Sequence, residues 1–121
     1  MNKSRKGKEY EQEVNRLFKF FGWETERSML SRGINDATAK IRYCDWRDYD
    51  RIVRNIFEYD GYTVTENKQK NFKEFKMRAR RTNRQREQRT TYYSIEIDEE
   101  EGIVTVKMQM KKNKLKRNGR E

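Results

Sequence analysis

The triplet Glu74-Phe75-Lys76 combines residue types that can hydrolyse a phosphodiester bond. Together with a further acid, a carboxylate and a lysine at this spacing can hold a divalent metal ion and activate a water molecule. The triplet lies in "FKEFKMRARRTNRQREQR", residues 72–89, where the chain concentrates its positive charge. The same segment can therefore be interpreted as a nuclease triplet, as a cationic strand or as a disordered arm.

Alternation within this segment favours the strand. Phe75, Met77 and Ala79 fall on one side and charged residues fall on the other, as expected for a strand with one buried face. A helix through the same residues would scatter the apolar side chains among cations on every side. We therefore predict a strand as far as Arg81, followed by an exposed arginine-rich loop over residues 82–90 that is disordered without a partner.

Most cations of this segment are arginines, and basic stretches at both chain ends accompany them. An edge strand needs only one or two charges to resist aggregation, whereas guanidinium groups contact phosphates bidentately or enter a DNA groove. We expect phosphate contacts from two groups of cations. The strand and loop contribute Lys76, Arg78, Arg80, Arg81, Arg84, Arg86 and Arg89, and the C-terminal stretch contributes Lys111, Lys112, Lys114, Lys116 and Arg117.

The formal net charge of the 121-residue chain is +10, and its distribution is uneven. Ten cations lie between Lys68 and Arg89 against two acids, whereas Asp98-Glu99-Glu100-Glu101 is a compact acidic turn. This asymmetry is typical of a protein that binds a polyanion, because phosphate neutralisation releases counterions. No membrane partner is expected, because the basic segments lack the wide apolar face of a membrane-lying helix and no apolar run approaches spanning length.

Several chemistries are excluded by residue types that are missing. With no histidine and with Cys44 as its one cysteine, the sequence cannot supply a zinc finger, a zinc knuckle or His-dependent catalysis. No Gly-rich phosphate loop, serine nucleophile elbow or C-x-x-C motif occurs. We expect no cofactor, no metal and no small-molecule substrate. Without a signal-peptide pattern or paired cysteines, we expect a cytoplasmic protein.

Two segments 39 residues apart share one pattern. In "YEQEVNRLFKFFGWETER" and "YDRIVRNIFEYDGYTVTE", apolar residues recur at helical spacing, and a glycine ends the helix before an aromatic residue and a strand-like stretch. A turn-rich connection and a second alternating stretch follow in each case. These features predict two pseudo-repeated α-β-β units, although helix, glycine, aromatic residue and strand can also follow one another without duplication.

The clearest β pattern lies near the C-terminus. "TYYSIEI" and "IVTVKMQMK" alternate apolar and polar residues around "DEEEG", as in a β-hairpin. The predicted fold class is α+β, with two α-β-β units, a C-terminal β-hairpin and helices packed on an antiparallel sheet. The single domain of residues 1–121 then divides into a basic N-terminal arm 1–7, units 8–44 and 45–81, the arginine-rich loop 82–90, the hairpin 91–111 and a basic tail 112–121.

The opening "RKGKEYEQEVNRLFKFFGWETERSMLSRGIND" resembles that of archaeal and phage junction resolvases, in which a Glu-bearing helix leads into a strand and then a metal-binding Asp. The resemblance covers about a quarter of the chain and implies a metal-dependent nuclease. The sequence departs from that pattern, because Asp36 lies 38 residues before Glu74 with a full helix between them. The alternative acid, Asp60, lies too close to Glu74 to leave room for the expected middle strand.

The sequence therefore favours a non-catalytic nucleic-acid-binding protein. Duplex DNA is the preferred partner, because paired units suit pseudo-symmetric half-sites. By analogy, a short basic protein of this kind fits an accessory or regulatory factor of a phage or conjugative element, with a protein partner in a larger nucleoprotein complex. Two alternatives stay open: a metal-dependent nuclease, and a protein-directed inhibitor from a mobile element.

Overall fold

The computed structural model describes residues 3–27, 35–68, 75–84 and 86–114 of the chain. Within these ranges it contains two helices and six strands. In chain order they are α1 (Lys3–Phe20), β1 (Glu24–Arg27), β2 (Asn35–Arg42), α2 (Tyr49–Tyr59), β3 (Thr63–Glu66), β4 (Met77–Thr82), β5 (Glu87–Asp98) and β6 (Ile103–Lys114).

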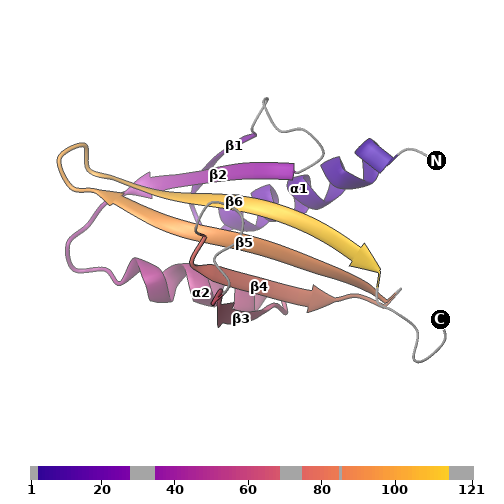
Figure 1. The fold of residues 1–121 in the computed structure, drawn as a ribbon. Coiled ribbons are helices and arrows are strands. Elements are labelled where there is room, and N and C mark those ends of the chain that lie inside the picture. Colours follow the sequence, from indigo (N-terminus) through magenta and orange to yellow (C-terminus); the bar gives the residue numbers. More distant parts are fainter. Residues whose placement is uncertain (1–2, 28–34, 69–74, 85, 115–121) are drawn as a thin grey trace.

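The six strands form one sheet in the order β1-β2-β6-β5-β4-β3, and each strand is antiparallel to its neighbours. Strands β1 and β3, the first strand after each helix, lie at opposite edges of the sheet (Figure 1). The long strands β5 and β6 pair along their whole length at the centre. The predicted α+β class, with helices packed on an antiparallel sheet, is confirmed.

Each helix ends at a glycine in the left-handed region, where other residues are strained. Gly22 has φ +91° and Gly61 has φ +88°. The backbone N–H of the next residue then donates back to the helix, from Trp23 to the Phe18 carbonyl and from Tyr62 to the Phe57 carbonyl, at 3.0 Å in both cases. These two turns direct the chain from the helix layer into the edge strands.

Both helices pack on the same face of the sheet (Figure 1). Aromatic rings form the centre of the contact. The ring centroids of Phe18 in α1 and Phe57 in α2 lie 5.4 Å apart, and Phe57 stacks on Tyr93 of β5 at 5.0 Å. All three side chains are fully buried. Near the middle of α1, the Tyr10 hydroxyl shares a 2.7 Å hydrogen bond with Thr91. The core therefore lies between the helices and one face of the sheet.

The element boundaries differ from the sequence expectations in three places. Helix α1 begins at Lys3, so it includes most of the segment that the charge pattern assigned to an N-terminal arm. Strand β5 begins at Glu87, so residues 87–90 lie in the sheet and not in an arginine-rich loop. Strand β6 runs to Lys114, three residues into the predicted tail. These stretches lack apolar alternation, and pairing with neighbouring strands holds 87–90 and 112–114 in place.

We expect Phe57→Ala to lower the free energy of unfolding by about 3–5 kcal/mol, because a large ring is removed from the centre of a small core. Trp46→Ala is the control, since the Trp46 side chain is 74% exposed and its loss should change stability by no more than about 0.5 kcal/mol. Urea unfolding followed by circular dichroism measures both values. Equal losses in the two variants would contradict the central role of Phe57.

Stability should fall at alkaline pH, because burial raises the pKa of Tyr10, Tyr62 and Tyr93 above the ordinary tyrosine value. Below about pH 10 all three are protonated in both states; above it the unfolded chain ionises first and is favoured. The Tyr93 hydroxyl has no hydrogen-bond partner among the described residues, so Tyr93→Phe leaves no group unsatisfied. At pH 11 this variant should retain about 1 kcal/mol more stability than the wild type. Parallel pH profiles of the two proteins would refute the expectation.

Candidate nucleic-acid interface

The second face of the sheet, here called the polar face, carries the side chains that alternate with the core. On β4, Ala79 is fully buried on the helix side, whereas Arg78, Arg80 and Thr82 point to the polar face. No described helix covers this face (Figure 1). From the strand registers its other members include Thr38, Lys40, Thr63, Thr65, Gln88, Thr90, Tyr92, Ser94, Thr105, Lys107, Gln109 and Lys111.

Strand pairing places cations from distant parts of the chain in common rows of the polar face. Arg80 pairs with Thr63 on β3 and with Thr90 on β5, and Thr90 pairs with Lys111 on β6. Since neighbouring strands are about 4.8 Å apart, the backbones at Arg80 and Lys111 are separated by roughly 10 Å. Thr63 beside Arg80 is exposed, whereas Thr90 between Arg80 and Lys111 is buried. Exposed hydroxyl groups and cations can both donate hydrogen bonds to phosphate oxygens.

A shallow hollow of about 330 Å³ lies over the β3–β4 edge of this face. Hydroxyl, guanidinium and amide groups contribute to its lining. The lining residues are Gly61, Thr63, Thr65, Arg78, Arg80, Arg81, Thr82 and Gln88. Of the expected binding residues, the structure thus brings Arg78, Arg80 and Arg81 together at one hollow.

The turn between β4 and β5 presents Arg84 and Arg86, whose side chains are exposed. Asn83 organises this turn: its side-chain carbonyl accepts a hydrogen bond from the Glu87 N–H at 2.9 Å, and its backbone carbonyl accepts one from Arg86 at 3.0 Å. Arg86 itself has φ +63°, in the left-handed region. The arginines therefore lie on a tight turn and not on a long loop.

The C-terminal cations meet this turn at one end of the sheet. The backbone of Lys114 pairs with Glu87, and that of Lys112 pairs with Arg89. The first turn of α1 lies at the same end (Figure 1). We call this region the basic end; it comprises Arg84, Arg86, Lys111, Lys112 and Lys114. Lys116 and Arg117 lie outside the described residues.

Two of the expected binding arginines are occupied inside the molecule. Arg81 donates to the Asp60 backbone carbonyl at 2.8 Å and to its carboxylate at 3.0 Å, and its guanidinium lies over the Tyr62 ring. Arg89 donates to the carboxylate of Glu13 on α1. The Arg89 side chain is only 12% exposed, so its guanidinium is largely shielded from water, whereas the Glu13 side chain is 38% exposed. Both arginines fasten the helix layer to the sheet.

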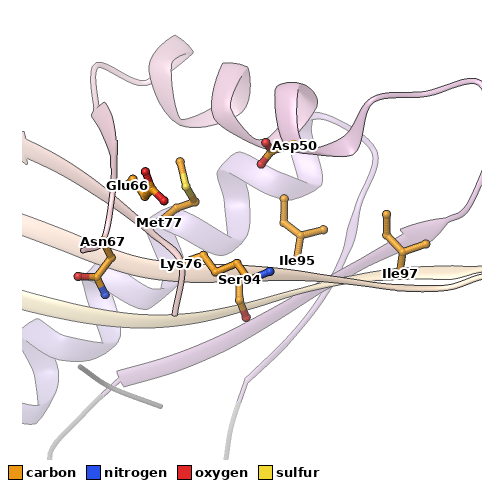
Figure 2. Close-up of a pocket in the computed structure, with 8 residues that line it drawn as sticks. All are labelled: Asp50, Glu66, Asn67, Lys76, Met77, Ser94, Ile95 and Ile97. Atoms are coloured by element: carbon orange, nitrogen blue, oxygen red, sulfur yellow. The ribbon is translucent and has the colours of Figure 1, made fainter. Parts of the chain in front are cut away.

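Lys76 is separated from Arg78 and Arg80. It lines a different hollow, of about 520 Å³, together with Asp50, Glu66 and residues of β5 (Figure 2). Glu74, the acid of the predicted E-x-K triplet, lies outside the described residues. Among the residues that the structure describes, no group of three or more His, Cys, Asp or Glu side chains is placed to hold a metal ion.

Acidic partners reduce the charge of the polar face at one lysine of β2 and one lysine of β6. Lys40 forms an ion pair with Glu26 at 3.6 Å, and Lys107 forms one with Glu96 at 3.0 Å. No ion pair is seen for Arg80 among the carboxylates whose side chains the structure describes. Arg80 of β4 therefore differs from Lys40 and Lys107, whose charges are balanced by neighbouring carboxylates.

Sequence reasoning did not identify the hydroxyl and amide groups of the interface. Thr63, Thr65, Gln88 and Thr90 stand beside the arginines through strand pairing alone. The alternation in "TVTE" could have indicated that Thr63 and Thr65 share a face, but not that this face carries Arg78 and Arg80.

None of the protein family models, curated proteins or solved structures compared with this chain matches it. Neither described helix is long and apolar enough to cross a membrane.

We expect the arginines to separate into two classes when they are replaced one at a time. Arg89→Ala should lower the free energy of unfolding by about 1–3 kcal/mol, because Glu13 loses a charged hydrogen bond at a shielded position. Arg80→Ala should change it by no more than about 0.5 kcal/mol, because the side chain is exposed. Thermal or urea unfolding measures the free energy of unfolding of both variants. Similar decreases in the two would contradict the division into structural and exposed arginines.

Proposed function

We propose that this protein binds nucleic acid without catalysis, preferring duplex DNA, through the polar face of the sheet and the basic end. The observation that carries the proposal is the segregation of charge within one rigid sheet. Arg78, Arg80 and Lys111 share the polar face with hydroxyl groups, and exposed arginines continue from it onto the β4–β5 turn. The acids of residues 98–101 lie at the opposite end of β5 and β6.

Contacts to the phosphate backbone dominate in this proposal. Six strands spaced about 4.8 Å apart give a sheet roughly 24 Å wide, which is too broad to enter a major groove about 12 Å wide. The cations of the face then contact phosphates along the duplex, and the narrower β4–β5 turn is the part that can reach into a groove. Such contacts position the protein and give affinity that depends on salt concentration.

The conformation of Arg86 supports a binding role for the turn. A residue other than glycine in the left-handed region costs roughly 1–2 kcal/mol, and glycine or asparagine would meet the same backbone requirement more cheaply. The chain nevertheless carries an exposed arginine at φ +63°. A side chain that contacts phosphate is a physical reason for tolerating this cost.

We infer in addition that the two α-β-β units are related by an internal two-fold axis. A shift of 39 residues carries Tyr10 to Tyr49 and Trp23 to Tyr62. A two-fold axis would carry the contact of Tyr10 with Tyr62 onto a contact of Tyr49 with Trp23. Both are present: Tyr62 lies near enough to Tyr10 to affect its pKa, and the ring centroids of Tyr49 and Trp23 lie 6.5 Å apart. Each unit also ends on one of the two central strands, β2 on β6 and β4 on β5.

The sheet register supports the same axis. The fully buried Ala39 of β2 pairs with Val106, and Ala79 of β4 pairs with Thr91. Midway between these two rows Tyr93 pairs with Met108, directly beneath the contact of both helices. A pseudo-symmetric scaffold of this kind suits a duplex, whose two strands are related by two-fold axes. The charges of the polar face do not follow the symmetry, so we assign most of the affinity to the second unit.

The biological setting that we propose is cytoplasmic, as an accessory or regulatory factor of a phage or conjugative element that joins a larger nucleoprotein complex. This step rests on analogy with other short basic proteins. A protein-directed inhibitor with an acidic target would also use the basic end. A metal-dependent nuclease would use Glu74 and Lys76. The binding experiment below separates these possibilities.

We expect the triple variant Arg80→Ala, Arg84→Ala and Arg86→Ala to bind duplex DNA much more weakly. The slope of the logarithm of the binding constant against the logarithm of the salt concentration should fall by about 3 in magnitude, since each lost phosphate contact removes about 0.9. The measurement is a titration of fluorescently labelled duplex DNA, single-stranded DNA and duplex RNA at several salt concentrations, with and without magnesium. Duplex DNA should bind most tightly, and it should remain intact with magnesium.

The matched control replaces Arg16, Arg47 and Arg51, three exposed arginines outside the sheet and the basic end. It removes the same charge, so a general electrostatic effect would lower affinity equally in both triple variants. Unchanged affinity in the first variant, or an unchanged slope, would defeat the proposal. Magnesium-dependent cutting that is lost in Glu74→Ala would replace it with the nuclease, and no binding to any nucleic acid would favour a protein target.

A further inference from the structure

Three exposed aromatic side chains form a cluster on the outer side of the helix layer. Phe20 ends α1, Phe21 follows it in the turn, and Tyr59 ends α2. The Phe20 and Tyr59 rings stack at 6.0 Å with an angle of 15°, and Phe21 packs edge-on against both, at 5.1 and 5.3 Å. Phe20 is 70% exposed and Tyr59 is 68% exposed. The cluster therefore holds its shape and still presents apolar surface to water.

Such a cluster is costly if it stays exposed. Single surface aromatics are common, but a contiguous and ordered apolar patch marks a site of interaction. Rings that are already packed against one another lose little side-chain freedom on binding, which favours them as interface anchors. The cluster lies on the helices, away from the polar face, so it is available to a partner while that face is occupied.

We propose that the cluster of Phe20, Phe21 and Tyr59 is a self-association surface, through which two copies of this chain form a back-to-back dimer. The argument for a second copy comes from charge. Lys19 precedes Phe20 and Glu58 precedes Tyr59, both are exposed, and the two are 39 residues apart. The surface thus carries opposite charges at corresponding positions on its two helices.

This arrangement is complementary to itself. In a two-fold dimer, the same surface of each copy faces the other, and residue i contacts j while j contacts i. When the dimer axis runs across the line that joins Lys19 and Glu58, Lys19 of one copy faces Glu58 of the other, and both pairs form at once. The aromatic rings meet at the centre, surrounded by these two pairs, which is the usual anatomy of an interface core and rim.

A back-to-back dimer directs its two polar faces outward. If the proposed function holds, one dimer can therefore bind two nucleic acid segments at the same time. The dimer itself does not depend on nucleic acid binding. Its test is therefore carried out on the free protein, and failure of one proposal is distinguishable from failure of the other.

The first experiment is sedimentation equilibrium of the full chain without nucleic acid. The wild type should show a reversible monomer–dimer equilibrium, and Phe20→Ser with Tyr59→Ser should raise the dimer dissociation constant about tenfold or more. Trp46→Ser is the matched control, because Trp46 is at least as exposed but lies outside the cluster; it should leave the constant unchanged. Circular dichroism verifies that each variant is folded.

A charge exchange identifies the partner as a second copy. Lys19→Glu alone and Glu58→Lys alone each place like charges opposite one another and should weaken the dimer, whereas the double variant restores opposite pairs and should recover it. Recovery in the double variant supports the proposal. A wild type that stays monomeric at every concentration overturns it, and so does a dimer that is indifferent to the aromatic changes or fails to recover in the double variant.

Discussion

The contact of Phe18, Phe57 and Tyr93 is the interaction on which the rest of the fold depends. It joins the two helices to each other and to the central strand β5, and all three rings are fully buried. Only 32% of the residues are hydrophobic, so the chain has enough apolar surface for a single modest core. Because these rings commit that core to one face of the sheet, the other face is left to threonine, glutamine, lysine and arginine.

A one-sided core divides neighbouring arginines into two kinds. Arg80 and Arg81 are consecutive, and strand geometry therefore turns them to opposite faces. Beside the core a charge loses water and needs a fixed counter-charge, which Asp60 supplies to Arg81 and Glu13 supplies to Arg89. On the polar face water solvates Arg80 without such a partner. The same residue type thus stabilises the fold on one face and stays available for binding on the other.

Local pattern was sufficient to predict the two helices, the glycines that end them, the alternation along β4 and the α+β class. These features depend on residues two to four positions apart, and the physics of one segment decides them. The occupied arginines could not be predicted in this way. Glu13 and Arg89 are 76 residues apart, and in "RARRTNRQREQR" every cation looks alike until the fold selects its neighbours.

The first residues of β5 also could not be predicted from local sequence pattern. Glu87 to Thr90 have no apolar alternation, and their composition indicates a loop. They lie in a strand because β4 and β6 flank them and satisfy their backbone groups on both sides. Pairing of this kind brings the end of β6 next to the β4–β5 turn, so the two basic stretches of the sequence form one surface. The basic end is therefore a product of topology and not of either stretch alone.

The inferred repeat allows the surface charges of the two α-β-β units to be compared. In the sheet register, Lys40 of β2 lies opposite Glu24 of β1, and Arg80 of β4 lies opposite Thr63 of β3. Lys40 also forms an ion pair with Glu26, whereas no ion pair is seen for Arg80 among the described carboxylates. Solubility alone would be served equally well by either pattern of surface charge. The proposed contact with a phosphate backbone rests on Arg80, for which no ion pair is seen among the described carboxylates, and on the exposed arginines of the neighbouring turn.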